Sequence, residues 1–297
     1  MNRTISYDLQ NEDNKTIIEF LKEKGYSIPI LQKLKANPCD VILDDEPGYL
    51  NREIKNRINL TTVIREYEKS DFIPSNIPLD ILYEDEDLII INKDNDMPIH
   101  PSIKHREGTL ANALTYYFKD EDSPFVYRCL NRLDKNTTGI TIIAKNPLSS
   151  AILSRQMKAD NIHRIYYAVV RGIIDKKGII DAPIARTSDS IITREVNFQT
   201  GQNAMTEYEP IESAGGNTLV KCRLKTGRTH QIRVHMAYID HPLVGDFLYG
   251  KEDNTDINGR QLLHAGEIDF THPITDVPMH ITAPLPTDFG DFRYVLP

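Results

Sequence analysis

The chain has 297 residues, of which 40% are hydrophobic and 26% are charged, a composition typical of globular proteins with room for two domains. Its three cysteines, Cys39, Cys129 and Cys222, are far apart and form no paired motif, which argues against a disulfide framework and a zinc cluster. The polar start of the sequence and the lack of a long apolar run lead us to expect a cytoplasmic protein without a membrane anchor.

The net charge of −8 is unevenly distributed along the chain. Residues 1–100 contain 20 acidic and 12 basic side chains, whereas residues 101–297 contain 23 of each. Within this neutral part, residues 217–235 carry five cations and no acid, namely Lys221, Arg223, Lys225, Arg228 and Arg233. A local basic stripe can bind phosphates even in an acidic protein, but a solvated strand face fits the same pattern equally well.

Residues 1–72 are expected to form a small α+β module. Residues 15–23 place apolar side chains at helical spacing, and residues 29–36 fit a second, shorter helix. Residues 39–59 have a short strand-like pattern that is broken by an acidic turn containing proline and glycine. The proline-containing residues 70–78 are the expected linker to a larger unit, residues 73–297.

The larger unit begins with residues 79–92, where two apolar runs about an acidic turn predict a hairpin. Thr109 is the expected N-cap of a helix that runs to residue 118. After a strand at residues 140–144, the pair Asn146-Pro147 is typical of the start of a further helix.

Residues 163–171 have too little alternation for a half-exposed strand and predict one that is buried on both faces. Residues 217–225 predict another strand, and Thr229 is the expected cap of a helix that follows it. Because strands and helices mix without regular alternation, we predict an α+β fold. Its core is a mixed, mostly antiparallel central sheet with flanking helices.

The most informative segment is residues 131–139, Asn-Arg-Leu-Asp-Lys-Asn-Thr-Thr-Gly. It places Asp134 in a turn between apolar segments, two residues after Arg132. A carboxylate held near a guanidinium stays ionised at neutral pH, so Asp134 is a candidate nucleophile or base. An aspartate in a turn is also common for local hydrogen-bonding reasons alone.

A second segment, residues 225–235, reads Lys-Thr-Gly-Arg-Thr-His-Gln-Ile-Arg-Val-His. The backbone amides of a helix start, with Arg228 just before and Arg233 one turn in, favour an anion site. This site could hold a phosphate, or it could hold Asp134 through a bidentate arginine. A purely structural ion pair is the competing interpretation.

Two further features bear on the chemistry. The five-residue step between His230 and His235 does not place both on one helical face, so we expect no metal site. Tyr166 and Tyr167 point to opposite faces of their predicted strand. One of them can stack on a nucleobase, although a tyrosine in such a strand is more commonly part of the core.

Together these segments resemble the RluA-type RNA pseudouridine synthases. The catalytic motif of that family, His-Arg-Leu-Asp-x-x-Thr-Ser-Gly, is matched by residues 131–139, with Asn131 in place of the histidine and Thr138 in place of the serine. Residues 164–172 match basic-x-Tyr-x-Ala-x-Val-x-Gly. Residues 226–250 match Thr-Gly-Arg-Thr-His-Gln-Ile-Arg-Val-His followed by His-Pro-Leu-x-Gly-Asp-x-x-Tyr-Gly. The two departures lie beside Asp134 and concern loop packing or RNA contacts.

The resemblance implies an isomerase that converts uridine to pseudouridine in rRNA or tRNA, without metal or cofactor. Such an enzyme must flip the base out of its stack to reach it. By resemblance, Asp134 is the catalytic aspartate, Tyr166 stacks on the base and assists proton removal, and Arg233 pairs with Asp134. The expected partner is RNA, bound by a monomer through Arg132, Arg164, Lys225, Arg228 and His230.

Many relatives carry an S4-type RNA-binding module where this chain has residues 1–72. The expected helices and strands occur in a compatible order, but residues 1–70 are acidic overall, whereas that module is usually basic. We therefore expect a degenerate S4-like module.

Two other functions fit parts of the pattern. A non-catalytic RNA-binding or RNA-chaperone protein on the same scaffold would use the basic segments without needing Asp134. A carboxylate-based glycosidase acting on nucleosides or sugars would need a second carboxylate near Asp134, and no motif supplies an obvious one.

Overall fold

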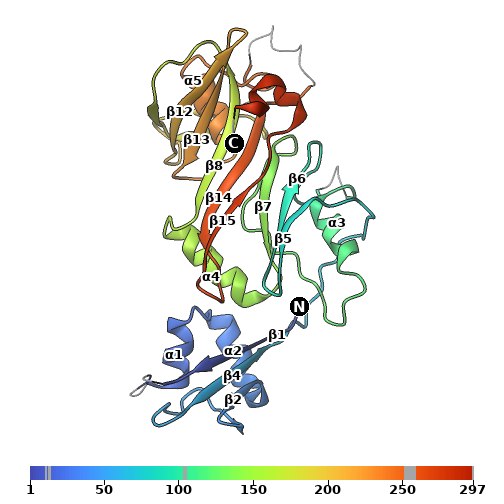
Figure 1. Cartoon of the computed structure of the whole chain (residues 1–297), viewed down its shortest axis with the longest axis vertical. Coiled ribbons are helices and arrows are strands. Elements are labelled where there is room, and N and C mark those ends of the chain that lie inside the picture. The colour runs from blue at the N-terminus through green and yellow to red at the C-terminus, as the bar shows by residue number, and fades with distance from the viewer. Residues whose placement is uncertain (11, 13–14, 103–105, 251–258, 296–297) are drawn as a thin grey trace.

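The computed structural model describes residues 1–10, 12, 15–102, 106–250 and 259–295. The N-terminal unit lies at one end of the long axis, at the bottom of Figure 1, and the larger unit fills the rest. In the part of the chain that is described, no helix has the length and apolarity needed to cross a membrane.

The N-terminal unit is a small antiparallel sheet with two helices. Its strands pair in the order β1-β4-β2-β3, and the helices at both predicted positions are confirmed. The S4-like character of this unit stays a prediction. The elements are β1 (Arg3–Asp8), α1 (Ile17–Glu23), α2 (Ile28–Ala36), the 3-10 helix η1 (Pro38–Asp40), β2 (Val41–Leu43), β3 (Glu46–Pro47) and β4 (Asn59–Ile64).

The larger unit is built on one large sheet. Among the described residues, nine strands pair in the order β5-β6-β7-β14-β8-β13-β12-β9, with β15 added to β14. The strands are β5 (Ile81–Glu84), β6 (Leu88–Lys93), β7 (Thr138–Ala144), β8 (His163–Arg171), β9 (Gly178–Asp181), β12 (Met205–Ala214), β13 (Asn217–Leu224), β14 (Leu263–Thr271) and β15 (Pro278–Thr282).

A two-stranded ribbon and several helices surround this sheet. They are β10 (Ile184–Arg186), β11 (Arg194–Val196), α3 (Leu110–Tyr117), α4 (Pro147–Lys158), α5 (Gln231–Tyr238) and the 3-10 helix η3 (Thr287–Tyr294). In the large sheet β7 and β14 pair in parallel and the other pairs are antiparallel. The predicted α+β class with a mixed, mostly antiparallel sheet is therefore confirmed.

Local sequence signals account for several of these elements. The side chains of Thr109 and Asn146 accept hydrogen bonds from the amides of the third residues of α3 and α4, as their N-cap positions predict. β8 is buried on both faces between β14 and β13, which explains its nearly continuous apolar sequence.

The parallel contact between β7 and β14 depends on a glycine. Gly139 pairs with Ala265 and has a backbone φ of 108°, a conformation that residues with a Cβ rarely adopt. A Cβ at this position would lie 2.2 Å from the carbonyl oxygen of Ala265. The glycine thus lets the turn before β7 lie directly against β14.

The two units share apolar packing. Leu148 and Ile152 of α4 belong to the same buried cluster as Phe20 and Leu21 of α1. Burial of this kind contributes about 25 cal/mol per Å² of apolar surface, so the N-terminal unit is held against α4 by a continuous core.

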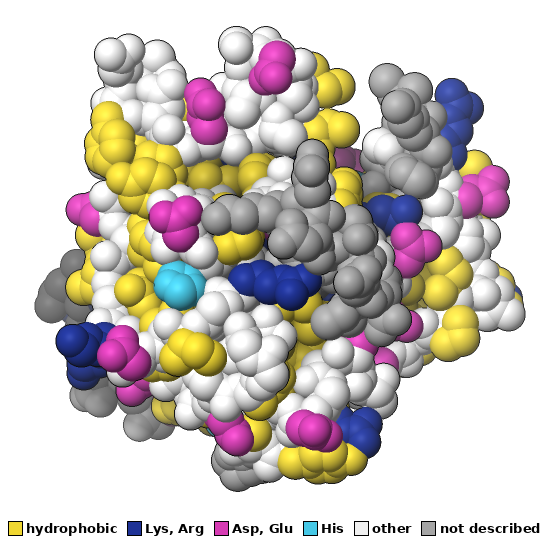
Figure 2. All heavy atoms as spheres, turned by 90° about the horizontal axis from the view of Figure 1, so that it is seen from above, with side chains coloured by type: hydrophobic (Ala, Val, Ile, Leu, Met, Phe, Trp, Pro, Cys, Tyr) yellow, Lys and Arg dark blue, Asp and Glu magenta, His cyan; other side chains and the backbone are white. Residues whose placement is uncertain are grey.

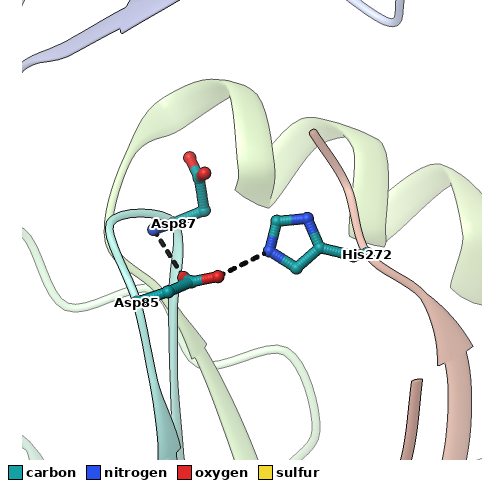
Figure 3. A group of neighbouring side chains, drawn as sticks. All are labelled: Asp85, Asp87 and His272. Atoms are coloured by element: carbon teal, nitrogen blue, oxygen red, sulfur yellow. Dashed lines mark hydrogen bonds and ion pairs between the residues drawn. The ribbon is translucent and has the colours of Figure 1, made fainter. Parts of the chain in front are cut away.

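A carboxylate-rich cluster lies at the same junction and consists of Asp85, Asp87 and His272 (Figure 3). Asp87 accepts two hydrogen bonds of 3.0 Å from the guanidinium of Arg3 in β1. It also accepts one of 2.7 Å from Asn146, the N-cap of α4. This carboxylate therefore ties the N-terminal strand to the larger unit.

The candidate ligand atoms of this cluster are already engaged by protein hydrogen bonds. Nδ1 of His272 accepts from two backbone amides, so Nε2 carries the ring proton and donates to Asp85 at 2.8 Å. Although burial opposes it, hydrogen bonds from His272 and Tyr83 hold the pKa of Asp85 well below its usual range. Each of the four carboxylate oxygens accepts at least one protein hydrogen bond, and we conclude that the cluster is structural.

Candidate active site

Asp134 lies in a turn that leads directly into β7. The amide of Thr137 donates to the Asp134 carbonyl at 3.0 Å. The buried side chain of Asn131 donates to the carbonyl of Ile140 at 2.8 Å and accepts from the amide of Ile142 at 3.0 Å. Asn131, which replaces the histidine of the motif, thus packs the chain before the turn against β7.

Two buried basic side chains donate hydrogen bonds to the backbone of this turn. Nζ of Lys93 donates to the carbonyl of Lys135 at 2.9 Å, and Nη1 of Arg260 donates to the carbonyl of Asn136 at 3.0 Å. Both cations are 1% exposed, and burial lowers the pKa of Lys93 from 10.5 to about 7. The backbone that directly follows Asp134 is therefore held by side chains from two distant segments.

Arg233 joins Asp134 to a second carboxylate. Its Nη1 donates to Oδ2 of Asp134 at 3.1 Å, so the predicted contact is present. The predicted bidentate geometry is wrong, however, because Nε and Nη2 form two bonds of 2.7 Å with Asp246 instead. Asp246 is fully buried beside Arg233, and its carboxylate is the bidentate partner of the guanidinium.

Asp134 consequently keeps one oxygen free of protein donors. No residue in the described ranges donates a hydrogen bond to Oδ1, whereas Oδ2 faces Arg233 at 3.1 Å and His230 at 3.7 Å. The side chain is 25% exposed. An acceptor that the protein leaves unused is available to a ligand.

The start of α5 differs from the prediction. Its N-cap is His230, which has a left-handed backbone with φ of 59°, so Thr229 is not the cap. The side chain of Gln231 accepts hydrogen bonds from the amide of Arg228 and the hydroxyl of Thr226. Of the two occupants predicted for this segment, the carboxylate of Asp134 contacts Arg233, which is itself buried.

Tyr166 lies at the base of the site, between Cys222 of β13 and Ala265 of β14. Its hydroxyl makes no hydrogen bond with any residue that the structure describes, and burial raises its pKa. Tyr167 lies on the other face and bonds Glu267. The prediction that the two tyrosines point to opposite faces is confirmed.

A cleft of about 360 Å³ opens above Asp134 and Tyr166, a size suited to a small molecule or a single base. Within the described residues that line it, Asp134 is the single carboxylate. The structure brings all the predicted site residues to this one cleft, namely Arg132, Asp134, Arg164, Tyr166, Lys225, Arg228, His230 and Arg233.

The cations at this cleft differ in how far the protein already uses them. Lys225 is 3.8 Å from Glu207, and Arg228 donates to the carbonyl of Asn203 at 3.0 Å. Arg132 is exposed, and Nε of Arg164 is buried without a hydrogen-bond partner in the described structure. Arg164 lines the cleft, and no described residue accepts from its Nε.

The basic segment 217–235 is not a continuous stripe. Lys221 pairs with Glu267 at 3.3 Å, and Arg223 lies with it on the face of β13 opposite the buried Cys222, away from the cleft. The face shown in Figure 2 likewise carries isolated Lys and Arg side chains among neutral and acidic ones. A solvated strand face thus describes the first part of the segment, and only the last part reaches the cleft.

Sequence reasoning missed two residues of the site. Asp246 holds Arg233, and the hydroxyl of Tyr249 lies 2.7 Å from Nδ1 of His230. The guanidinium of Arg233 lies over the Tyr249 ring at 5.1 Å. Both residues belong to the matched string Gly-Asp-x-x-Tyr-Gly, so the signal was present in the motif but no role had been given to it.

This arrangement falls within a recognisable family. Residues 87–238 match the family described as RNA pseudouridylate synthase, and they contain Asp134, Tyr166 and Arg233. The chain belongs to this family, which confirms the resemblance found in the sequence. It is an RNA pseudouridine synthase, an isomerase.

Named relatives agree with this assignment. The chain is 38% identical over 277 residues to the uncharacterized RNA pseudouridine synthase YjbO of Bacillus subtilis (strain 168), covering 93% of this chain and 97% of the relative. It is 37% identical over 276 residues to ribosomal large subunit pseudouridine synthase D of Escherichia coli O157:H7, covering 89% and 81%. The solved structure of human RNA Pseudouridylate Synthase Domain Containing 1 superposes with a TM-score of 0.58 at 26% identity, covering 71% and 84%.

Proposed function

We propose that this enzyme isomerises specific uridines of ribosomal RNA and that Asp134 is its catalytic residue. The observation that carries the proposal is the free Oδ1 of Asp134 in a cleft lined by cations and by no other described carboxylate. The name of the Escherichia coli relative refers to the large ribosomal subunit, and this favours rRNA over tRNA as the substrate.

The reaction places simple demands on the carboxylate. The bond between N1 of uracil and C1′ of the ribose breaks, the base turns while held, and C5 joins C1′ and loses its proton. An ionised carboxylate with one free oxygen can attack C1′ or remove a ribose proton. Arg233 donates to Oδ2 at 3.1 Å and leaves Oδ1 available in both mechanisms.

Tyr166 is proposed to stack on the target base. A base must leave its stack to enter the cleft, and an aromatic ring compensates for part of the lost stacking, by about 1–3 kcal/mol. Because burial raises its pKa, the hydroxyl is protonated at neutral pH. It can assist removal of the C5 proton only by passing its own proton on.

The remaining cations are proposed to bind the RNA around the target. Arg132, Arg164, Lys225 and Arg228 line the cleft, and each phosphate contact adds a salt-dependent contribution to affinity. We further propose a cytoplasmic monomer with RNA as partner. In it, residues 1–72 form a degenerate S4-like module beside a catalytic unit of residues 73–297.

The other functions predict different behaviour. A glycosidase would need a second carboxylate, and Asp246 lies on the other side of Arg233. Both of its oxygens are bonded to Arg233, however. A non-catalytic RNA-binding protein would retain its cellular effect after Asp134→Asn, whereas the proposed isomerase would not.

Tritium release from RNA labelled at C5 of uridine tests the proposal, because pseudouridine formation displaces that hydrogen. Wild type and Asp134→Asn are compared on rRNA and on tRNA, both isolated from cells that lack the protein. We expect release from rRNA by the wild type alone. Release from tRNA alone would show that tRNA, not rRNA, is the substrate. Equal release by both proteins would show that Asp134 is not the catalytic residue.

A further inference from the structure

His230 has a left-handed backbone at the start of α5. Its φ of 59° lies in a region that few residues other than glycine adopt, although asparagine, aspartate and histidine are enriched there. The side chain makes no capping hydrogen bond to α5. The ring does not cap the helix, and its contacts lie with Tyr249 and Asp134.

The ring is held by a short chain of hydrogen bonds. The backbone amide of Arg194 in β11 donates to the hydroxyl oxygen of Tyr249 at 2.9 Å, and that oxygen lies 2.7 Å from Nδ1 of His230. Since the phenol oxygen already accepts the Arg194 proton, we assign its own proton to the bond with Nδ1. Nε2 of the neutral imidazole then carries the ring proton.

This protonated nitrogen faces the catalytic candidate. Nε2 of His230 lies 3.7 Å from Oδ2 of Asp134, the oxygen that also accepts from Arg233. The distance exceeds that of a hydrogen bond, but contacts in an empty site commonly tighten when substrate is bound. Burial lowers the pKa of His230, which keeps the ring in the neutral form at neutral pH.

We propose that His230, fixed by Tyr249, is a positioning residue that orients the carboxylate of Asp134. Together with Arg233 it engages Oδ2, so that Oδ1 is left to face the target nucleotide. This inference rests on the proposed catalytic role of Asp134. It replaces the expectation that His230 contacts RNA, because its side chain is only 11% exposed and Nδ1 is already bonded to Tyr249.

Two substitutions of His230 separate the ring from the backbone. Asparagine adopts the left-handed conformation readily, so His230→Asn preserves the start of α5 but does not reach Asp134. In His230→Gln, the terminal amide can reach the position of Nε2 and donate to Oδ2. Tyr249→Phe keeps the ring over Arg233 and removes only the hydroxyl that sets the tautomer.

The measurement is the single-turnover rate of tritium release with saturating rRNA, together with the RNA Kd and the Tm of each variant. We expect His230→Asn to lower the rate by about tenfold to a hundredfold with unchanged Kd and Tm. His230→Gln should recover part of this loss, and Tyr249→Phe should show a smaller one. If His230→Asn lowers the Tm, the rate of Tyr249→Phe tests the positioning role instead, because that substitution does not change the backbone of α5.

Wild-type rates in His230→Asn and Tyr249→Phe would overturn the inference. So would a raised Kd with an unchanged rate at saturation, which indicates an RNA contact instead. Asp134→Asn is measured in parallel. If it releases tritium as fast as the wild type, the proposed function itself fails, and this result is distinct from a failure that is confined to His230.

Discussion

Two carboxylate sites of this molecule are built from similar residues but have opposite properties. At the junction of the two units, every carboxylate oxygen of Asp85 and Asp87 accepts a hydrogen bond from the protein. At the cleft, Asp134 is bonded through Oδ2 alone. The difference teaches that acidic and basic residues close together do not by themselves mark a functional site, whereas unused hydrogen-bonding capacity in a cleft does.

The largest combined effect on stability and activity is expected from a substitution that would bring a protein donor to the free oxygen of Asp134. In Asp246→Asn, Nε and Nη2 of the buried Arg233 face a neutral amide instead of a carboxylate. We expect the guanidinium to turn toward Asp134 and to donate to its Oδ1 as well. Removing one partner of a buried ion pair costs about 3–5 kcal/mol. We therefore expect both a lower Tm and a large loss of tritium release, and wild-type values for both would contradict the role given to Asp246.

At the junction, the matching change should affect stability alone. Asp87→Asn removes the charge that binds Arg3 through two bonds of 3.0 Å. Arg3 keeps an exposed ion pair with Glu86, so the loss should be about 2–3 kcal/mol, below the usual range for a buried pair. Chemical denaturation measures it, and release at low temperature should stay at the wild-type rate if the junction is only structural.

A moderate effect is expected for Arg164→Ala at the cleft. Arg164 lines the cleft, so the alanine variant removes one cation from the surface that is proposed to bind RNA. We expect the Kd for rRNA to rise about tenfold and the salt dependence of binding to fall by about one phosphate contact. An unchanged Kd and salt slope would show that Arg164 does not contact RNA.

The smallest effect should come from Lys221→Met on the face of β13 away from the cleft. Lys221 and Glu267 form a pair at 3.3 Å with side chains that are 35% and 18% exposed. Such pairs contribute about 0–1 kcal/mol, and methionine keeps most of the aliphatic stem. Tm and tritium release should therefore both remain close to wild type. A loss of RNA binding would instead show that this face of β13 contacts RNA.

Much of the fold could be predicted because its signals are local. The caps Thr109 and Asn146 and the hairpin of β5 and β6 depend on residues within a few positions of each other. The resemblance placed Asp134, Tyr166 and Arg233 together because it compared ordered motifs. None of these predictions required knowledge of which strand lies beside which.

The failures concern partners that are distant in sequence or chosen among many candidates. Glu267 of β14 forms an ion pair with Lys221 of β13, and a count of charges along one segment cannot detect such a partner. The cap predicted at Thr229 is wrong because α5 begins at Gln231, after His230 turns the chain with a left-handed backbone. Asp246 lies in the matched string Gly-Asp-x-x-Tyr-Gly, but the string alone does not show that this aspartate binds Arg233, which follows from the packing of α5.

The most direct test of the account is Asp134→Asn, measured for tritium release and for Tm in the same preparation. Asparagine has the size of aspartate but lacks the charge, and Asp134 makes only one hydrogen bond to Arg233 within the described structure. The account predicts no detectable release together with a Tm within a few degrees of wild type. Substantial release by the folded Asp134→Asn protein would contradict the claim that the free oxygen of Asp134 performs the chemistry.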